Sequence, residues 1–504
     1  MALMLSGCFG AGGTDTGSDD AGGALAGWVD APLPELAAPL PITELVDFSG
    51  VARLNMGSNC TGTLIDTGVA TAPAYILTNG HCTGDVGRSG QGTTIAEEWF
   101  GEAEFFRVEG NFDATASAEG EVLEYSTMYG RDLAIVRLDT TLGALQALGA
   151  RAMPIADEQP KPGADVINVA VPMQNLDEDE QVLRRGNCTL AEQHTLIEFG
   201  WLWFDAWAND CPGVVQGSSG SPLFGLDAEG APEAIVAMIN TTSWGASAQN
   251  GGWCFINRPC QVSADGVNMV EQTSYAVSVA GVNRCFDASG VFTLGGECPL
   301  VVTDVWANRG GGSFRGGGEG NAMEQLPDVS LHGRVEGEVR TVLVPLGNGQ
   351  ACTEASTYAG SASQVLPFVE EPWADGLVVD VDLPATEGHY ALCAVSGADY
   401  AGAVTVLFEV DRTPPLFRAG AEVEALGEGV FQVRPHLAPP EITTVRFTHG
   451  PQGKVDCADT ASFQEFFVVP LTLFPEELPA TYCVYGMDAA GNTTPVETVQ
   501  IPRK

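Results

Sequence analysis

The chain has 504 residues, with 65 Asp or Glu against 22 Lys or Arg, so its formal net charge at pH 7 is −43. Such a charge repels phosphate backbones and excludes a nucleic-acid partner from our expectations. The length suits about three to four domains. The 62 glycines, 30 prolines and 17% charged residues favour a β-rich protein with many turns.

The first 44 residues carry little that a core could bury. Leu5-Ser6-Gly7-Cys8 resembles the lipobox of bacterial lipoproteins, so we expect a truncated lipoprotein signal over 1–8 and lipidation of Cys8. The alternative is an unpaired cysteine in a disordered leader. Residues 9–44 are mostly Gly, Ala, Asp, Thr and Pro, and they predict a flexible tether. This places the protein in the bacterial cell envelope, lipid-anchored, or outside the cell. The rest of the sequence contains no apolar run of about 18 residues, so we expect no transmembrane helix.

Short apolar runs broken by turn residues begin near residue 45. Strands are predicted at 62–65, 74–77, 133–136 and 234–238. Short strands of this kind, with no sustained helical periodicity, suit packed antiparallel barrels.

Three polar residues stand at the ends of these runs in a significant order. His81 follows Tyr-Ile-Leu-Thr-Asn-Gly, Asp132 opens Leu-Ala-Ile-Val, and Ser219 lies in Gly-Ser-Ser-Gly-Ser-Pro. A serine hydroxyl needs a base, a carboxylate that holds the base, and donors for the oxyanion that forms. Ser219 is the candidate nucleophile, His81 the base and Asp132 the carboxylate, and the N–H groups of Gly217 and Ser219 are the candidate oxyanion hole.

The order His, Asp, Ser differs from that of subtilisins and α/β-hydrolases. With Ser243-Trp244-Gly245 and Ser274-Tyr-Ala-Val277 further on, the chain resembles the chymotrypsin/trypsin family of serine endopeptidases over about residues 45–290. The resemblance implies a double antiparallel β-barrel in a peptidase domain of residues 45–300. It also implies peptide-bond hydrolysis through an acyl-enzyme, polypeptide substrates and no cofactor.

The same resemblance indicates which residues line the substrate cleft. They are Gly213, Val214, Thr242, Ser243, Trp244 and Gly245. The serine of Ser-Trp-Gly supports the catalytic Asp in the family. Gly213 and Val214 cannot neutralise a cation, so we expect small or neutral side chains before the cleaved bond; the alternative is that Asp210 swings into the pocket. Ser218 replaces an Asp that switches on many family members, which predicts no such switch here.

Twelve of the thirteen cysteines pair by neighbourhood, which indicates an oxidising compartment. The sequence does not fix the connectivity. The neighbouring pairs are Cys60 with Cys82, Cys188 with Cys211, Cys254 with Cys260, Cys285 with Cys298, Cys352 with Cys393, and Cys457 with Cys483. No zinc-ligand spacing appears, so we expect no metal. The acidic run 177–180 is the one alternative, as a calcium site.

Beyond residue 300 the composition changes twice. Residues 301–325 contain two Gly triplets and predict a linker. Residues 326–411 and 412–504 share a pattern of one early and one late cysteine within β-rich sequence, and Pro414-Pro415 resembles the start of bacterial immunoglobulin-like modules. We predict two β-sandwich modules, and hence an all-β chain, which we expect to be a monomer.

Two other function classes stay open. A surface adhesion or binding protein that retains a protease fold without catalysis is the main alternative, and an esterase with the same chemistry is another. Trp201, Trp203 and Trp207 are expected in the core or cleft wall, with a carbohydrate platform as their alternative.

Overall fold

The computed structural model describes residues 33–55, 58–83, 93–111, 116–198, 201–245, 254, 257–263, 266–303, 305–307, 314–316, 329–333, 336–366, 377–379, 384–415, 419–435, 442, 444–466, 469–488 and 490–503. Strands dominate this part of the chain, and the prediction of an all-β protein is confirmed. Two short α-helices occur, α1 (Leu45–Phe48) and α2 (Leu142–Ala147). Cys8 lies outside the described residues.

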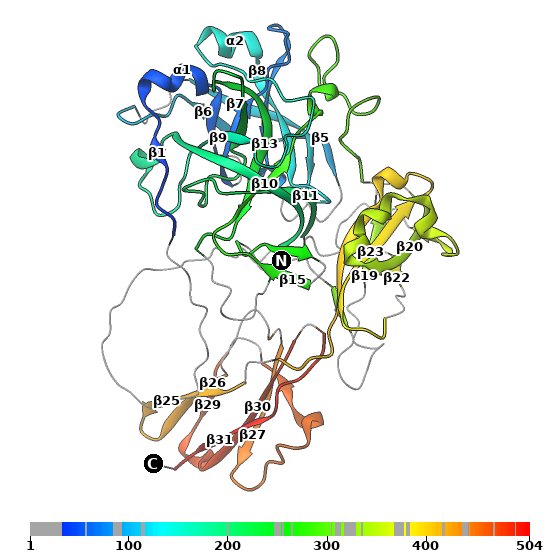
Figure 1. The fold of residues 1–504 in the computed structure, drawn as a ribbon. Coiled ribbons are helices and arrows are strands. Elements are labelled where there is room, and N and C mark those ends of the chain that lie inside the picture. Colours follow the sequence, from blue (N-terminus) through cyan, green and yellow to red (C-terminus); the bar gives the residue numbers. More distant parts are fainter. Residues whose placement is uncertain are drawn as a thin grey trace.

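The first sheet contains a closed barrel of six strands (Figure 1). Its order is β5-β7-β6-β2-β3-β4-β8, and pairing of β7 with β8 closes the ring. The strands are β2 (Val51–Asn55), β3 (Asn59–Leu64), β4 (Pro73–Thr78), β5 (Thr94–Glu98), β6 (Glu102–Phe105), β7 (Ala116–Thr127) and β8 (Leu133–Thr141).

Strand β8 shows why both sides of this barrel wall are apolar. Successive side chains of a strand point to opposite faces. Ala134 and Val136 therefore fill the barrel interior, whereas Leu133 and Ile135 join a second core shared with the following sheet. The two sheets thus pack against each other across β8, the strand that begins directly after Asp132.

The second sheet has nine strands in the order β11-β16-β13-β12-β9-β10-β14-β15, with β1 on β10. Pairing of β10 with β11 completes a circuit of six strands, as a second barrel requires; that barrel stays a prediction. The strands are β1 (Ala38–Pro39), β9 (Asp165–Ala170), β10 (Arg184–Glu198), β11 (Trp201–Asn209), β12 (Pro222–Leu226), β13 (Pro232–Thr242), β14 (Cys260–Ser263), β15 (Gly266–Met269) and β16 (Ser274–Ser278).

The end of the predicted tether packs onto this sheet. Ala38 pairs with Arg185 on β10, and Leu40 is buried in the core between the sheets. The packed chain therefore begins several residues before the boundary predicted at residue 45. The reason is Leu40, an apolar side chain that is 1% exposed in that core.

Two further groups of sheets follow (Figure 1). In the first, a three-stranded and a five-stranded sheet share one core; in the second, a three-stranded and a four-stranded sheet do so. Two sheets that share one core are what a β-sandwich requires. The two predicted β-sandwich modules nevertheless stay a prediction. The strands are β17 (Val305–Ala307), β18 (Phe314–Gly316), β19 (Val329–Gly333), β20 (Gly337–Pro345), β21 (Ser363–Leu366), β22 (Leu377–Val379), β23 (Gly388–Ser396), β24 (Val404–Val410), β25 (Ala421–Gly427), β26 (Val430–Pro435), β27 (Thr444–Pro451), β28 (Gln464–Glu465), β29 (Leu471–Leu473), β30 (Ala480–Met487) and β31 (Glu497–Ile501).

The predicted linker 301–325 supplies strands to the first of these groups. Strand β17 pairs with β19, and β18 pairs in parallel with β24. Val305 is buried in the core that β17 and β19 share with the neighbouring strands. The group therefore starts before the boundary predicted at 326.

The structure contains six disulfides, which join the six neighbouring pairs named above. Their number indicates an extracellular or secreted protein, because thiols stay reduced in the cytosol. Among the described residues, no helix is long and apolar enough to cross a membrane.

The hairpin β10–β11 also packs against the first C-terminal group. Ile197 and Leu202 share a core with Leu346, Tyr358 and Leu407 of that group. The disulfide Cys352–Cys393 lies within the same cluster. This contact ties the group to the second sheet, next to the candidate site.

Leu202 gives a test of this contact. It is 3% exposed, so Leu202→Ala should lower the free energy of unfolding by roughly 2–5 kcal/mol through lost burial and the cavity left behind. Thermal unfolding of the whole chain measures the loss. The matched control is Leu148→Ala, at 60% exposure, for which we expect less than about 0.5 kcal/mol. Equal effects of the two substitutions would contradict the shared core.

Candidate active site

His81 and Asp132 form the centre of the candidate site. His81 lies on a short 3-10 helix (Gly80–Thr83) after β4, and Asp132 precedes β8, which pairs with β4. The Asp132 carboxylate accepts two hydrogen bonds from His81: Oδ1 from the backbone N–H at 3.0 Å and Oδ2 from Nδ1 at 2.6 Å. Its position is fixed further, because the Asn79 side chain donates to the Asp132 carbonyl.

Burial and charge together set the protonation of this pair. The side chain of Asp132 is fully buried, and that of His81 is 26% exposed. Burial lowers the pKa of His81, but the charge of Asp132 and its hydrogen bond raise it, as does the charge of Glu198; the net direction is upward. An ionised carboxylate only accepts, so Nδ1 carries the proton and Nε2 is left as the basic atom of neutral His81.

The turn that carries Ser219 is bonded to the first sheet by Thr61. The Thr61 N–H donates to the Ser219 carbonyl and its hydroxyl to the Gly217 carbonyl, both at 2.8 Å. Cys60, next to Thr61, is disulfide-bonded to Cys82, next to His81. These links bring Ser219 to the same edge of the barrel as His81. Among the described residues, the Ser219 hydroxyl makes no hydrogen bond; such bonds are often long in free enzymes.

Two backbone donors beside Ser219 are unused. Within the described part of the chain, the N–H groups of Gly217 and Ser219 donate to no acceptor, whereas those of Ser218 and Gly220 do. Gly217 has φ +99°, and a Cβ there would lie 2.7 Å from the Met173 nitrogen. Only glycine fits this backbone conformation and this space. The turn therefore presents two N–H groups as an oxyanion hole would.

Three predicted pocket residues are placed as follows. Gly213 lies against the backbone of 36–37, and Val214 is 2% exposed within a core cluster. The Thr242 hydroxyl lies 3.0 Å from that of Ser274. Asp210 is exposed and accepts from the Thr189 N–H, so it stays on the surface rather than entering a pocket. Of these residues, only Thr242 lies on the strand beside the nucleophile turn.

The segment Ser243-Trp244-Gly245 does not take the expected role. The Ser243 hydroxyl donates to the carbonyls of Val270 and Thr273, so it holds that loop and does not support Asp132. Trp244 and Gly245 form a turn beyond the end of β13. The physical reason is register: the Gly220 N–H donates to the Ile239 carbonyl, which places the residues directly after Ile239 beside Ser219.

The sequence analysis missed three buried polar side chains on these strands. Asn240 and Thr241 follow Ile239 on β13, and Glu198 ends β10; they are 3%, 8% and 4% exposed. Neither amide atom of Asn240 has a hydrogen-bond partner in the described residues. The Thr241 hydroxyl and Oε2 of Glu198 make no hydrogen bond of ordinary length and angle there, although Thr241 lies close enough to lower the pKa of Glu198. The only signal in the sequence was a single Glu within the apolar run 196–203.

The hydroxyl groups of Ser218 and Ser221, on either side of Ser219, each have a hydrogen-bond partner nearby. The Ser218 hydroxyl accepts from the Val215 N–H at 3.3 Å, and that of Ser221 accepts from Asn168 at 2.8 Å. Both serines are fully buried. The position before Ser219 thus needs no charged partner to hold the turn.

Neither candidate metal position has ligands suited to a metal. Sulfur atoms of Cys60 and Cys82 lie close to His81, but the disulfide leaves no thiolate to bind a metal. In the acidic run 177–180, Glu180 accepts from the Asp177 N–H and Glu178 pairs with Arg53. These carboxylates thus serve local contacts of the chain.

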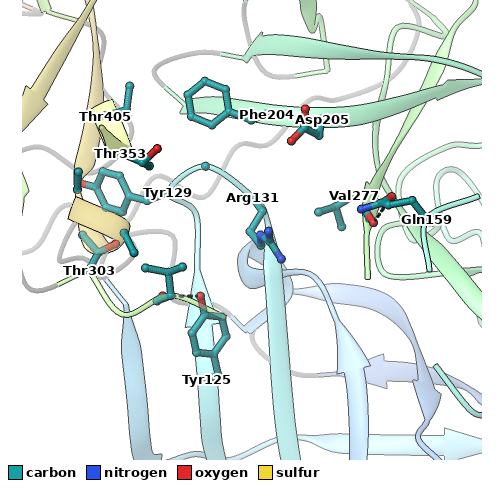
Figure 2. Close-up of a pocket in the computed structure, with 15 residues that line it drawn as sticks. Tyr125, Tyr129, Arg131, Gln159, Phe204, Asp205, Val277, Thr303, Thr353 and Thr405 are labelled. Carbon is teal, nitrogen blue, oxygen red and sulfur yellow. Dashed lines mark hydrogen bonds between the residues drawn. The ribbon is translucent and has the colours of Figure 1, made fainter. Parts of the chain in front are cut away.

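A separate cavity of about 360 Å³ lies between the two sheets and the first C-terminal group. Figure 2 shows Arg131, the neighbour of Asp132, among the residues that line it, with Phe204 and Asp205 of β11 above it in this view and Thr353 and Thr405 at the left. None of the residues predicted to line the substrate cleft borders this cavity. It is therefore distinct from the predicted substrate pocket.

Comparison with known proteins identifies one family similarity. Residues 60–235, which include His81, Asp132 and Ser219, match the family model of the trypsin-like peptidase domain. No curated protein matches the chain. This segment is therefore similar to a trypsin-like peptidase domain.

Solved structures with a similar fold are distant. A thermostable serine protease AL20 from an extremophilic microorganism is 14% identical, with 47% of this chain and 95% of that chain covered and a TM-score of 0.32. A Glu endopeptidase is 16% identical, with 50% and 95% covered and a TM-score of 0.32. A scabies mite inactivated protease paralogue is 14% identical, with 47% and 93% covered and a TM-score of 0.32. These similarities are too distant to bear on activity.

Removing the charge of Asp132 tests the electrostatics of the pair. Asp132→Asn should lower the pKa of His81, because the charge and hydrogen bond that raise it are lost. An amide also cannot accept from both N–H groups, which should cost about 1–3 kcal/mol of stability. Titration of the histidine ring nitrogens by NMR measures the pKa, with the His81 signal identified by its absence in His81→Gln. Asp139→Asn, exposed on the same strand, is the control; an unchanged His81 pKa in Asp132→Asn would contradict the pairing.

Proposed function

We propose that this chain is a serine endopeptidase with a triad of His81, Asp132 and Ser219. The observation that carries the proposal is the His81–Asp132 pair held by two hydrogen bonds at the edge to which Thr61 bonds the Ser219 turn. The match of residues 60–235 to the trypsin-like peptidase domain supports a serine peptidase.

The mechanism follows from these atoms. Nε2 of His81 takes the proton of the Ser219 hydroxyl as Oγ attacks the peptide carbonyl, and the imidazolium is stabilised by Asp132. The oxyanion accepts from the N–H groups of Gly217 and Ser219. His81 then donates its proton to the leaving amine, and water releases the acyl group from Ser219 by the same steps in reverse.

The substrate is a polypeptide, and the proposal includes no cofactor, metal or nucleic acid. Register places Ile239–Thr242 beside the nucleophile, so we propose this strand as the one that an extended substrate pairs with. Lipidation at Cys8, with the protein bound to the bacterial envelope or released, completes the proposal. The chain acts as a monomer, and the two C-terminal groups are sandwich modules that accompany the peptidase domain.

A non-catalytic binding protein with a protease fold is the alternative function. It is favoured by the Ser219 hydroxyl, which makes no hydrogen bond with the described residues. An active site predicts covalent labelling of Ser219 by a fluorophosphonate, and a binding protein predicts none. An esterase would be labelled as well, but it would leave casein uncut.

Ser219→Ala and His81→Ala should each lower casein hydrolysis by at least about 10³-fold without unfolding the chain, because triad members act as a unit. Fluorophosphonate labelling and casein cleavage are the measurements, with circular dichroism as the check on folding. Ser263→Ala, at an exposed serine, is the control and should keep full activity. A folded Ser219→Ala protein that cuts casein at the wild-type rate would end the proposal.

Gly217→Ala tests the oxyanion hole. An added methyl group would meet Met173 and force the residue from φ +99°, which moves an N–H donor; we expect kcat to fall by about 10²-fold or more. Gly230→Ala is the matched control, since Gly230 also has a positive φ of +84° but nothing lies within 4 Å of its Cβ position. This control measures the effect of backbone strain alone, without displacement of the N–H donor at Gly217. Equal activities of the two variants would show that the N–H of Gly217 contributes nothing.

A further inference from the structure

Glu198 is a buried carboxyl whose hydrogen-bonding capacity is only partly used. It follows Leu196 and Ile197, which are 0% and 1% exposed, and is itself 4% exposed. Its Oε1 accepts from the Asn257 N–H at 2.8 Å, whereas Oε2 has no partner in the described residues. Burying a carboxylate in this way is costly unless a positive charge faces it.

The groups around Glu198 belong to the candidate site. The Thr241 hydroxyl borders the carboxyl, and Thr241 is two residues beyond Ile239, which accepts from the residue after Ser219. Among the described residues, the charged groups that act on Glu198 are His81 and Asp132, and those that act on His81 are Asp132 and Glu198. Protonated His81 is thus the cation that faces this carboxyl in the described structure.

We propose that Glu198 is a positioning residue of the site, a second carboxylate that acts on His81 through space and thereby sets the pH range in which His81 serves as a base. The role of His81 as a base rests on the proposed function, but the action of Glu198 on His81 does not. Within the described part of the chain no hydrogen bond joins Glu198 to His81 or Ser219, so its effect is electrostatic and passes through the imidazole.

The protonation behaviour agrees with this placement. Burial raises the pKa of Glu198 to about 7, against the lowering effects of Thr241, Asn257 and His81. Glu198 therefore ionises in the range in which a histidine titrates, and each ionised Glu198 favours the imidazolium. As the pH rises through 7, the carboxylate forms and holds the proton on His81 to higher pH than Asp132 alone would.

The direction in which a substitution of Glu198 should shift the pKa of His81 follows from this charge. Glu198→Gln removes the negative charge and keeps a carbonyl that can accept from the Asn257 N–H. The pKa of His81 should then fall, by about 1 pH unit for charges several Å apart in a partly buried setting. The acid limb of kcat/KM should move to lower pH by the same amount.

The experiment is an NMR titration of the His81 ring nitrogens in the whole chain, wild type against Glu198→Gln. It requires no catalysis, so its failure and that of the proposed function are distinguishable. Asp132→Asn serves as the positive control. Glu192→Gln is the matched control, because Glu192 is exposed on the same strand and acts on His194; it should shift His194 and leave His81 unchanged.

A folded Glu198→Gln protein whose His81 titrates as in the wild type would overturn the proposal. If that variant does not fold, the wild-type curve decides. Two coupled groups give a His81 curve with a second inflection near pH 7, and a single-proton curve would overturn the proposal. Glu198→Asp, which keeps the charge, should keep the elevated pKa; a fall equal to that of Glu198→Gln would show a purely structural role.

Discussion

The candidate site depends on Thr61, through which a strand of the first sheet holds a turn of the second. Its backbone N–H and its hydroxyl bond the carbonyls of Ser219 and Gly217. Both acceptors are carbonyls of the turn, and among the described residues the N–H groups of Gly217 and Ser219 donate to no acceptor. The same bonds bring Ser219 to the barrel edge that carries His81. One threonine thus fixes the position of the Ser219 turn against the first sheet.

A second constraint is the burial of negative charge in a chain whose net charge is already −43. Most acidic residues of such a chain need only water, but Asp132 and Glu198 are buried beside His81. Asp132 accepts from two N–H donors of His81, whereas Glu198 has a single backbone donor and a raised pKa. The two carboxyls thus differ because of the hydrogen bonds they receive, although both face the same imidazole.

The hairpin β10–β11 connects this site with the rest of the chain. Glu198 is the last residue of β10. The cross-strand pair Ile197 and Leu202, next to it, packs into the first C-terminal group. The cavity beside Arg131 lies along the same contact. Packing of that group therefore bears on the strand that holds the second carboxyl, which gives the C-terminal part a physical connection to the site.

The sequence alone determined what lies in contiguous residues. The motifs of His81, Asp132 and Ser219 and the all-β character follow from local patterns. The sequence suggested the neighbouring cysteine pairs but did not fix their connectivity, which the structure shows. Strand pairing over long separations was decided only by the tertiary structure. Register placed Asn240 and Thr241, rather than Ser243, beside Ser219, and it brought Glu198 from another strand to His81. A one-residue change of register turns every side chain to the other face, so no local motif contains this information.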